Sequence, residues 1–132
     1  MPVEPTWLDA NTVIAVNREL LDGTPEPHGV LDWGKLDSAV NRPRMCFAYD
    51  EIDDVGDLAV LLMFAIARSH AFQQGNKRTG FVAADVFLKL NGYRLTVPDI
   101  ADTAKRMVAV IEGHATFGEF QRFIDPYIQP IP

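Results

Sequence analysis

The chain has 132 residues, which is the usual size of one domain. With 48% apolar and 23% charged residues, the composition excludes a disordered or low-complexity chain. Eighteen acidic against twelve basic side chains give a net charge of −6, which disfavours a general role in binding nucleic acid. The longest apolar run, 58–67, is too short to span a bilayer, and the N-terminal residues do not resemble a secretory signal. We therefore expect a cytoplasmic protein without a membrane partner.

The first third of the chain shows two helices separated by a loop. A helix is predicted over 7–21, because Thr6 and Asp9 have the spacing of a capping box in front of helically spaced apolar residues. Residues 22–30 contain two prolines and two glycines, which predicts a loop. A short second helix is then expected to begin after Asp32.

A different pattern follows this second helix. We expect the helix to end before Pro43, because the residue in front of a proline is disfavoured in the helical conformation. Met45, Phe47 and Tyr49 then alternate with other residues, which is a weak signal for a strand or hairpin over about 43–49.

The two most apolar segments lie in the middle of the chain. Residues 58–67 are apolar on every side and follow an acidic cluster over 50–57, which suits the positive end of a helix dipole. Residues 81–90 are almost as apolar and stop at Asn91-Gly92. These patterns predict two buried helices.

Two further helices complete the prediction. One begins at Pro98 and is closed by Gly113, and the other follows a second capping box, Thr116 with Glu119. Residues 1–132 are therefore predicted to form a single all-α domain of about six helices with one short hairpin.

The residues that can carry chemistry lie between the two apolar helices, in the segment SHAFQQGNKRTG (69–80). Polar side chains near a core cost desolvation energy unless they have a partner or a ligand. The window 58–84 contains no acid, although Arg68, Lys77 and Arg78 are present in an acidic chain. The sequence thus predicts a local positive pocket.

This segment has the parts of a phosphate site. Gly75 and Asn76 precede a predicted helix, whose first backbone N–H groups are free to bind an anion. Lys77 and Arg78 are unfavourable next to the positive end of a helix dipole unless an anion is bound there. His70 can act as a general base near neutral pH.

The run HAFQQGNKRTG resembles the signature of the Fic/Doc family, H-x-F-x-[D/E]-[A/G]-N-[G/K]-R. Lys77 and the short single domain are similar to the Doc (death-on-curing) branch, the toxins of toxin–antitoxin pairs. The upstream run HGVLDWGKLDSAVNRP and the downstream run FLKLNGYRL are also similar to this branch, so the resemblance covers roughly 7–125.

The resemblance implies roles for the residues of the motif, 70–78. His70 would be the general base that activates a hydroxyl of a target protein, and Phe72 would be a buried anchor of the loop. The residues implied to hold the nucleotide phosphates are Gly75, Asn76, Lys77 and Arg78.

The segment 44–49 matches the family's flap, which docks the target protein as an added strand. The flap residues named by the resemblance are Arg44, Met45, Phe47 and Tyr49. Family members use a nucleoside triphosphate such as ATP together with Mg²⁺. Most transfer AMP to a protein hydroxyl, whereas the Doc branch is associated with transfer of the terminal phosphate and with arrest of translation.

The chain departs from the pattern at Gln74, where the family has the acid that ligates the metal. A neutral amide oxygen binds Mg²⁺ more weakly than a carboxylate does. Three functions therefore stay open: phosphate transfer by a Doc-like toxin, AMP transfer, and a non-catalytic module that binds a nucleotide or a partner. The inhibitory pattern [ST]-x-x-x-E-[GN] of many Fic proteins is absent from the sequence, so the resemblance implies control by a separate antitoxin.

Overall fold

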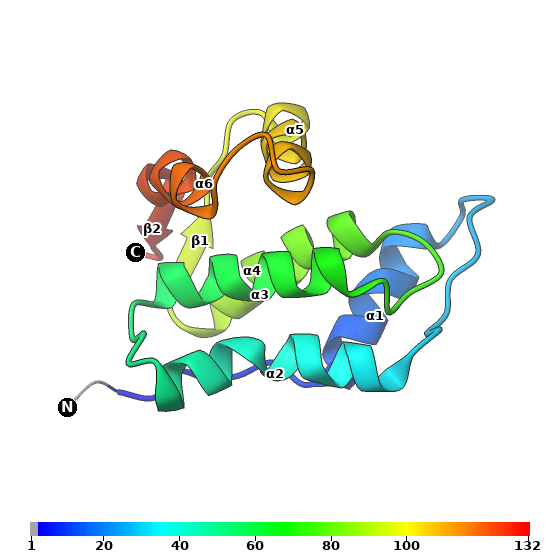
Figure 1. Cartoon of the computed structure of the whole chain (residues 1–132), viewed down its shortest axis with the longest axis horizontal. Coiled ribbons are helices and arrows are strands. Elements are labelled where there is room, and N and C mark those ends of the chain that lie inside the picture. Colours follow the sequence, from blue (N-terminus) through cyan, green and yellow to red (C-terminus); the bar gives the residue numbers. More distant parts are fainter. Residues whose placement is uncertain (1–2) are drawn as a thin grey trace.

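Six α-helices and a small antiparallel sheet make up residues 3–132, the part of the chain that the computed structural model describes (Figure 1). This arrangement confirms the predicted all-α class. Within these residues, no helix combines the length and the apolar character needed to cross a membrane. The elements are α1 (Ala10–Leu21), α2 (Trp33–Tyr49), α3 (Val55–Ser69), α4 (Asn76–Leu90), β1 (Tyr93–Leu95), α5 (Ile100–Ile111), α6 (Phe117–Ile124), the 3₁₀ turn η1 (Asp125–Tyr127) and β2 (Ile128–Pro130).

The helices α3 and α4 form the centre of the fold (Figure 1). More than half of α3 is buried, as its uniformly apolar sequence predicts. Helix α2 packs against α3, α1 packs against α4, and α5 packs against α3 and α6. The motif segment connects α3 to α4, so its position is set by the way these two helices pack.

The two central helices approach each other closely at Gly80. A Cβ atom at this position would lie 2.4 Å from the carbonyl oxygen of Met63 and 3.2 Å from the amide nitrogen of Ala67. Ala83 and Ala84 continue the contact on α4 and are fully buried. Small side chains on one helix therefore let the two backbones pack almost directly on each other.

The predicted cap of the first helix was wrong by three residues. Asp9 itself caps α1, because its carboxylate accepts a hydrogen bond from the Thr12 amide at 2.8 Å. Thr6 instead donates its amide to the side chain of Asn91 at 2.8 Å. The ring of Trp7 stacks on Phe87 with the centroids 5.9 Å apart, so the segment before Asp9 packs against α4 outside the helix.

The predicted strand or hairpin over 43–49 was also wrong. Helix α2 continues through Pro43 to Tyr49. Val40, Pro43 and Cys46 recur at every third residue and are all buried, so the helical period dominates this segment. Burial also raises the pKa of the Cys46 thiol, which packs as a small apolar group.

The strands occur at the other end of the chain. β1 pairs with β2 in antiparallel register, with Arg94 opposite Gln129. The second predicted capping box is confirmed, because Thr116 and Glu119 each accept a hydrogen bond from the other's backbone amide. The last helix ends at Ile124, before Pro126, as predicted.

We predict that Gly80→Ala destabilises the fold, because the new methyl group would overlap the Met63 carbonyl. Overpacking of this kind costs about 1–3 kcal/mol of unfolding free energy. Urea unfolding followed by circular dichroism measures this loss. Gly118→Ala in α6 is the matched control, because its Cβ would lie 3.4 Å from the end of the flexible Arg122 side chain and at the ordinary contact distance of 4.0 Å from the Thr116 hydroxyl. Equal stability of the Gly80→Ala variant and the parent would contradict the close approach.

Candidate functional site

His70 lies at the point where α3 ends and the chain reverses. It is the C-cap residue, with φ 52° and ψ 28° in the left-handed region. The Ser69 hydroxyl stabilises this turn, because it donates to the Ile66 carbonyl at 2.7 Å and accepts from the Ala71 amide at 3.1 Å. The turn leaves the imidazole of His70 exposed. The histidine side chain therefore lies outside the core, at the C-terminal end of α3.

The motif loop is held by Phe72 and Asn76. The Phe72 side chain is only 2% exposed. The Asn76 amide side chain accepts from the Phe72 backbone N–H at 3.1 Å and donates to the Phe72 carbonyl at 3.0 Å. Because both polar ends of this side chain bind the loop, the side chain of Asn76 holds the loop in shape.

A neighbouring segment of the chain also pairs with the loop. The Leu31 amide donates to the Ala71 carbonyl at 2.7 Å, and the Gln73 amide donates to the Gly29 carbonyl at 3.1 Å. These bonds flank an isolated bridge between Val30 and Phe72. The loop after α1 therefore supports the motif from outside.

Two buried polar residues that sequence analysis missed complete the support. Asn17 is 2% exposed and donates its side-chain amide to the Gln74 carbonyl at 2.9 Å and to the Thr79 hydroxyl at 3.0 Å. Thr79 is fully buried. The sequence does contain a signal for Asn17, because this polar residue interrupts the apolar face that Val13 and Leu21 form on α1.

Helix α4 begins with an open N-terminus. Gly75 is its N-cap, with φ 76° and no side chain to cap the helix. The first hydrogen bond of the helix runs from the Thr79 amide to the Gly75 carbonyl at 2.8 Å. The amides of Asn76, Lys77 and Arg78 therefore have no carbonyl partner within the helix. Three backbone donors at the positive end of a helix dipole suit a bound anion.

The sequence predicted one positive pocket with Arg68, Lys77 and Arg78, but the structure separates Arg68 from the other two cations. Lys77 and Arg78 are exposed on the first turn of α4. The Arg78 guanidinium binds the Glu26 carboxylate at 2.6 Å. Arg68 instead lines a cleft between α2 and α3. An anion at the start of α4 would replace Glu26 as the partner of Arg78.

The Gln74 side chain is exposed, and the Gln74 backbone carbonyl accepts the hydrogen bond from Asn17. Among residues 3–132, no three histidine, cysteine or acidic side chains lie close enough together to hold a metal ion. The motif thus offers backbone N–H donors and cations that fit an anion, and at the position of the family's acid it offers a metal the neutral amide oxygen of Gln74.

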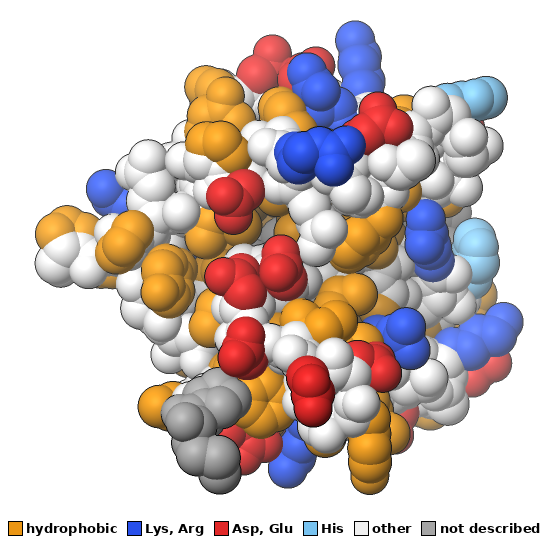
Figure 2. All heavy atoms as spheres, turned by 60° about the vertical axis from the view of Figure 1, so that its left-hand side comes forward, with side chains coloured by type: hydrophobic (Ala, Val, Ile, Leu, Met, Phe, Trp, Pro, Cys, Tyr) orange, Lys and Arg blue, Asp and Glu red, His pale blue; other side chains and the backbone are white. Residues whose placement is uncertain are grey.

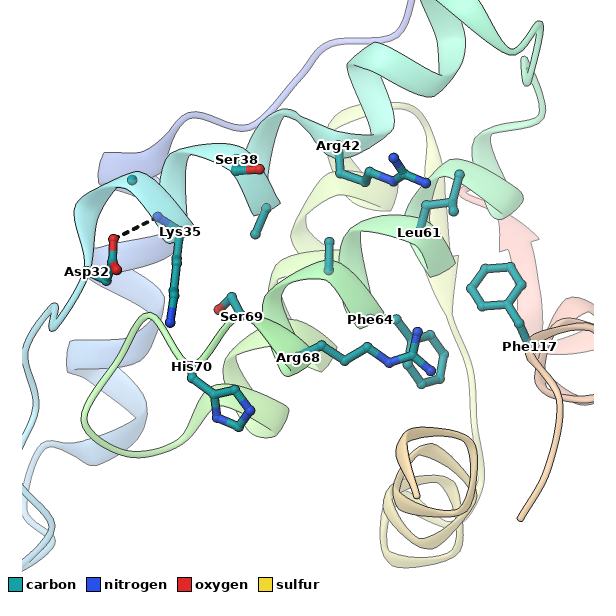
Figure 3. Close-up of a pocket in the computed structure, with 13 residues that line it drawn as sticks. Asp32, Lys35, Ser38, Arg42, Leu61, Phe64, Arg68, Ser69, His70 and Phe117 are labelled. Carbon is teal, nitrogen blue, oxygen red and sulfur yellow. Dashed lines mark hydrogen bonds between the residues drawn. The ribbon is translucent and has the colours of Figure 1, made fainter. Parts of the chain in front are cut away.

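His70 stands at the end of the cleft between α2 and α3, which has a volume of about 880 Å³ (Figure 3). Phe117 of α6 closes one side of the cleft. Residues of α2 and α3 provide most of the lining. Among the motif residues 70–78, His70 borders the cleft, next to Ser69 at the end of α3. A group bound in this cleft can reach the imidazole.

The predicted flap residues do not meet the motif. They lie on the last turns of α2 and are absent from the cleft lining. Arg44 lies 4.0 Å from the Glu4 carboxylate, and Phe47 packs edge-to-face on Trp7 with the centroids 5.7 Å apart. Met45 and Tyr49 are exposed. The backbone of this segment is bonded within the helix, so it has no free strand edge to offer a partner.

Comparison with known proteins agrees with the motif. The sequence pattern of the Fic/DOC family matches residues 7–88. The chain is 39% identical over 80 residues to the toxin Doc of Mycolicibacterium smegmatis, covering 60% of this chain and 62% of that protein. It is 35% identical over 75 residues to the protein named "Protein kinase doc" of Escherichia phage P1, covering 56% of this chain and 60% of that protein.

The chain thus spans less than two thirds of the length of either relative. The matched region contains α1, α2, α3 and nearly all of α4, including the complete motif. Together with the helical fold, this match shows that the chain belongs to the Fic/DOC family and is similar to its Doc members.

Proposed function

We propose that the protein is a Doc-like toxin that transfers the terminal phosphate of a nucleoside triphosphate, such as ATP, to a hydroxyl of a target protein. One observation carries this proposal: a single rigid loop places the exposed His70 at a cleft and begins α4 with open amides. The name of the relative from Escherichia phage P1 supports phosphate transfer over AMP transfer.

In this proposal His70 removes the proton of the target hydroxyl as its oxygen attacks the terminal phosphorus. The bond between that phosphorus and the bridging oxygen breaks, and the nucleoside diphosphate leaves. The amides of Asn76 to Arg78, the Lys77 ammonium and the Arg78 guanidinium stabilise the charge on the phosphate oxygens. Phe72 and Asn76 hold these donors in place before the nucleotide binds.

Mg²⁺ would neutralise the phosphate oxygens when bound, and the Gln74 amide oxygen is the motif's own donor toward it. Around the motif, the exposed cations Lys77 and Arg78 oppose entry of a bare cation. We propose that the ion enters together with the nucleotide.

The name of the relative from Mycolicibacterium smegmatis supports a role as a toxin. We propose that the protein acts in the cytoplasm on a protein of the translation machinery. We also propose that a separate antitoxin controls it. Gln74 favours a second candidate, a non-catalytic module that binds a nucleotide without transferring any part of it.

We predict that the purified protein, incubated with ATP and a cell lysate, adds the mass of one phosphate to a protein. Mass spectrometry measures this gain. His70→Ala should reduce the modification rate by about 10²–10⁴-fold, because removal of a general base has that effect. His114→Ala is the matched control, since this histidine is exposed and lies after α5, outside the cleft.

Each other outcome favours a different function. A mass gain of one AMP would replace phosphate transfer by AMP transfer. Full activity of the His70→Ala variant would contradict the role of His70. Bound ATP without any mass gain would favour the non-catalytic module.

We predict that Gln74→Glu lowers the Mg²⁺ concentration needed for half-maximal activity and raises the rate, because a carboxylate attracts the ion by charge as well as by coordination. A Mg²⁺ titration of the modification rate measures the effect. Gln73→Glu changes the charge equally at the adjacent exposed residue and should leave the titration curve close to that of the parent. Identical curves for Gln74→Glu and Gln73→Glu would contradict the position of the metal donor.

A further inference from the structure

The cleft beside His70 has an apolar floor and a cationic rim (Figure 3). Leu61 and Phe64 of α3 contribute to the floor. The rim carries Lys35 and Arg42 from α2 and Arg68 from α3. Apolar contact area next to spaced positive charges suits a peptide segment that carries acidic side chains.

The three cations of the rim have no acidic partner. Within residues 3–132, no carboxylate lies within ion-pair distance of Lys35, Arg42 or Arg68. Asp32 is the acid of the lining, and its carboxylate accepts a hydrogen bond from the Lys35 backbone amide at 3.0 Å as the cap of α2. Unpaired cations gathered in one cleft of an acidic chain create a local positive potential.

Arg68 is oriented for this role. Its guanidinium lies 5.4 Å from the centre of the Phe64 ring and donates to the Val110 carbonyl at 3.5 Å. These contacts fix the guanidinium between the Phe64 ring and α5, at the border of the cleft that Arg68 lines.

The opposite charge gathers elsewhere on the molecule. The connection between α2 and α3 carries an acidic cluster, and Figure 2 shows carboxylates gathered on the end of the molecule that holds this connection. The cluster consists of Asp50, Glu51, Asp53 and Asp54 in the connection, together with Asp57 in the first turn of α3. A partner with acidic groups is therefore repelled from this end and attracted to the cleft, which orients its approach.

Two exposed apolar side chains flank Asp32, the N-cap residue of α2 that borders the cleft. Leu31 is 63% exposed and Trp33 is 60% exposed. They lie at the start of α2, and the Leu31 amide binds the Ala71 carbonyl of the motif loop. Large exposed apolar groups are typical of the sites where protein partners dock.

We propose that the cleft docks the target protein through an acidic segment of its chain, which brings the adjacent hydroxyl to His70. This inference rests on the proposed function and adds the chemistry by which the target is recognised. The residues that hold the nucleotide phosphates in that function, from Gly75 to Arg78, do not line the cleft, whereas His70 does. The cleft is therefore free for the second substrate.

The test uses a fluorescein-labelled peptide in which one threonine is flanked by glutamates and a leucine, and a matched peptide with glutamine at every glutamate. Fluorescence anisotropy measures binding to the whole protein. The parent should prefer the acidic peptide. The double variant Lys35→Glu/Arg42→Glu should bind it roughly tenfold more weakly, because four units of charge change turn exposed attractions into repulsions.

The matched control is Arg94→Glu/Lys105→Glu, which makes the same charge change at exposed residues outside the cleft and should bind the peptide nearly as the parent does. Circular dichroism checks that both double variants fold. Calorimetry with ATP should give the same nucleotide affinity for the cleft variant and the control.

Three results would overturn the docking site. They are equal binding of the two peptides, equal peptide binding by the two double variants, and loss of ATP affinity in the cleft variant with peptide binding intact. The last result would assign the cleft to the nucleotide. Peptide binding needs no transfer reaction, so the docking site and the proposed function can fail separately. Selective peptide binding without any modified lysate protein would contradict the transfer reaction and still support the docking site.

Discussion

The contact between Gly80 of α4 and the Met63 carbonyl of α3 is the constraint on which the rest of the structure depends. Because no side chain separates the two backbones there, the helices lie at a fixed spacing. That spacing fixes both ends of the motif loop, His70 where α3 ends and Gly75 where α4 begins. A loop this short, held at both ends, has few conformations open to it.

Within this frame the side chains of the loop divide into two groups. Phe72 is buried and Asn76 forms hydrogen bonds with the loop backbone, and Asn17 of α1 adds a further bond to that backbone. His70 and Arg78 remain exposed, together with the first amides of α4. The donors are thus positioned before any ligand arrives, which is the arrangement that makes electrostatic stabilisation effective. Glu26 adds a built-in competitor, since it binds Arg78 in the absence of another anion.

Sequence analysis predicted the helices well where apolar residues recur over a long stretch, as in α3 and α4. It also placed the motif between them, because a polar loop so close to a core indicates a site that binds a ligand. It failed at α2, where Met45 and Phe47 alternate like a strand while the buried Pro43 and Cys46 follow the helical period. A short window cannot separate these two periods, and the burial of Pro43 decides between them.

The remaining features depend on contacts between distant parts of the chain. Asn17 binds Gln74 and Thr79 across 57 and 62 residues, and Glu26 reaches Arg78 across 52. β1 lies in a run in which Tyr93, Leu95 and Val97 alternate with polar residues, a strand signal that the sequence analysis did not use, but its pairing with β2 more than 30 residues later cannot be read from that run. Local patterns carry no information about such pairings, because each depends on the packing of the central helices.

The first turn of α4, with its open amides, is the site that we propose for the phosphates of a nucleotide. The most direct test is an amide NMR titration of the ¹⁵N-labelled protein with a non-hydrolysable ATP analogue and Mg²⁺. We expect the largest shifts at the amides of Asn76, Lys77 and Arg78, with small shifts at Lys35 and Arg42 in the cleft. Saturation with the analogue that leaves the first turn of α4 unshifted would contradict this site.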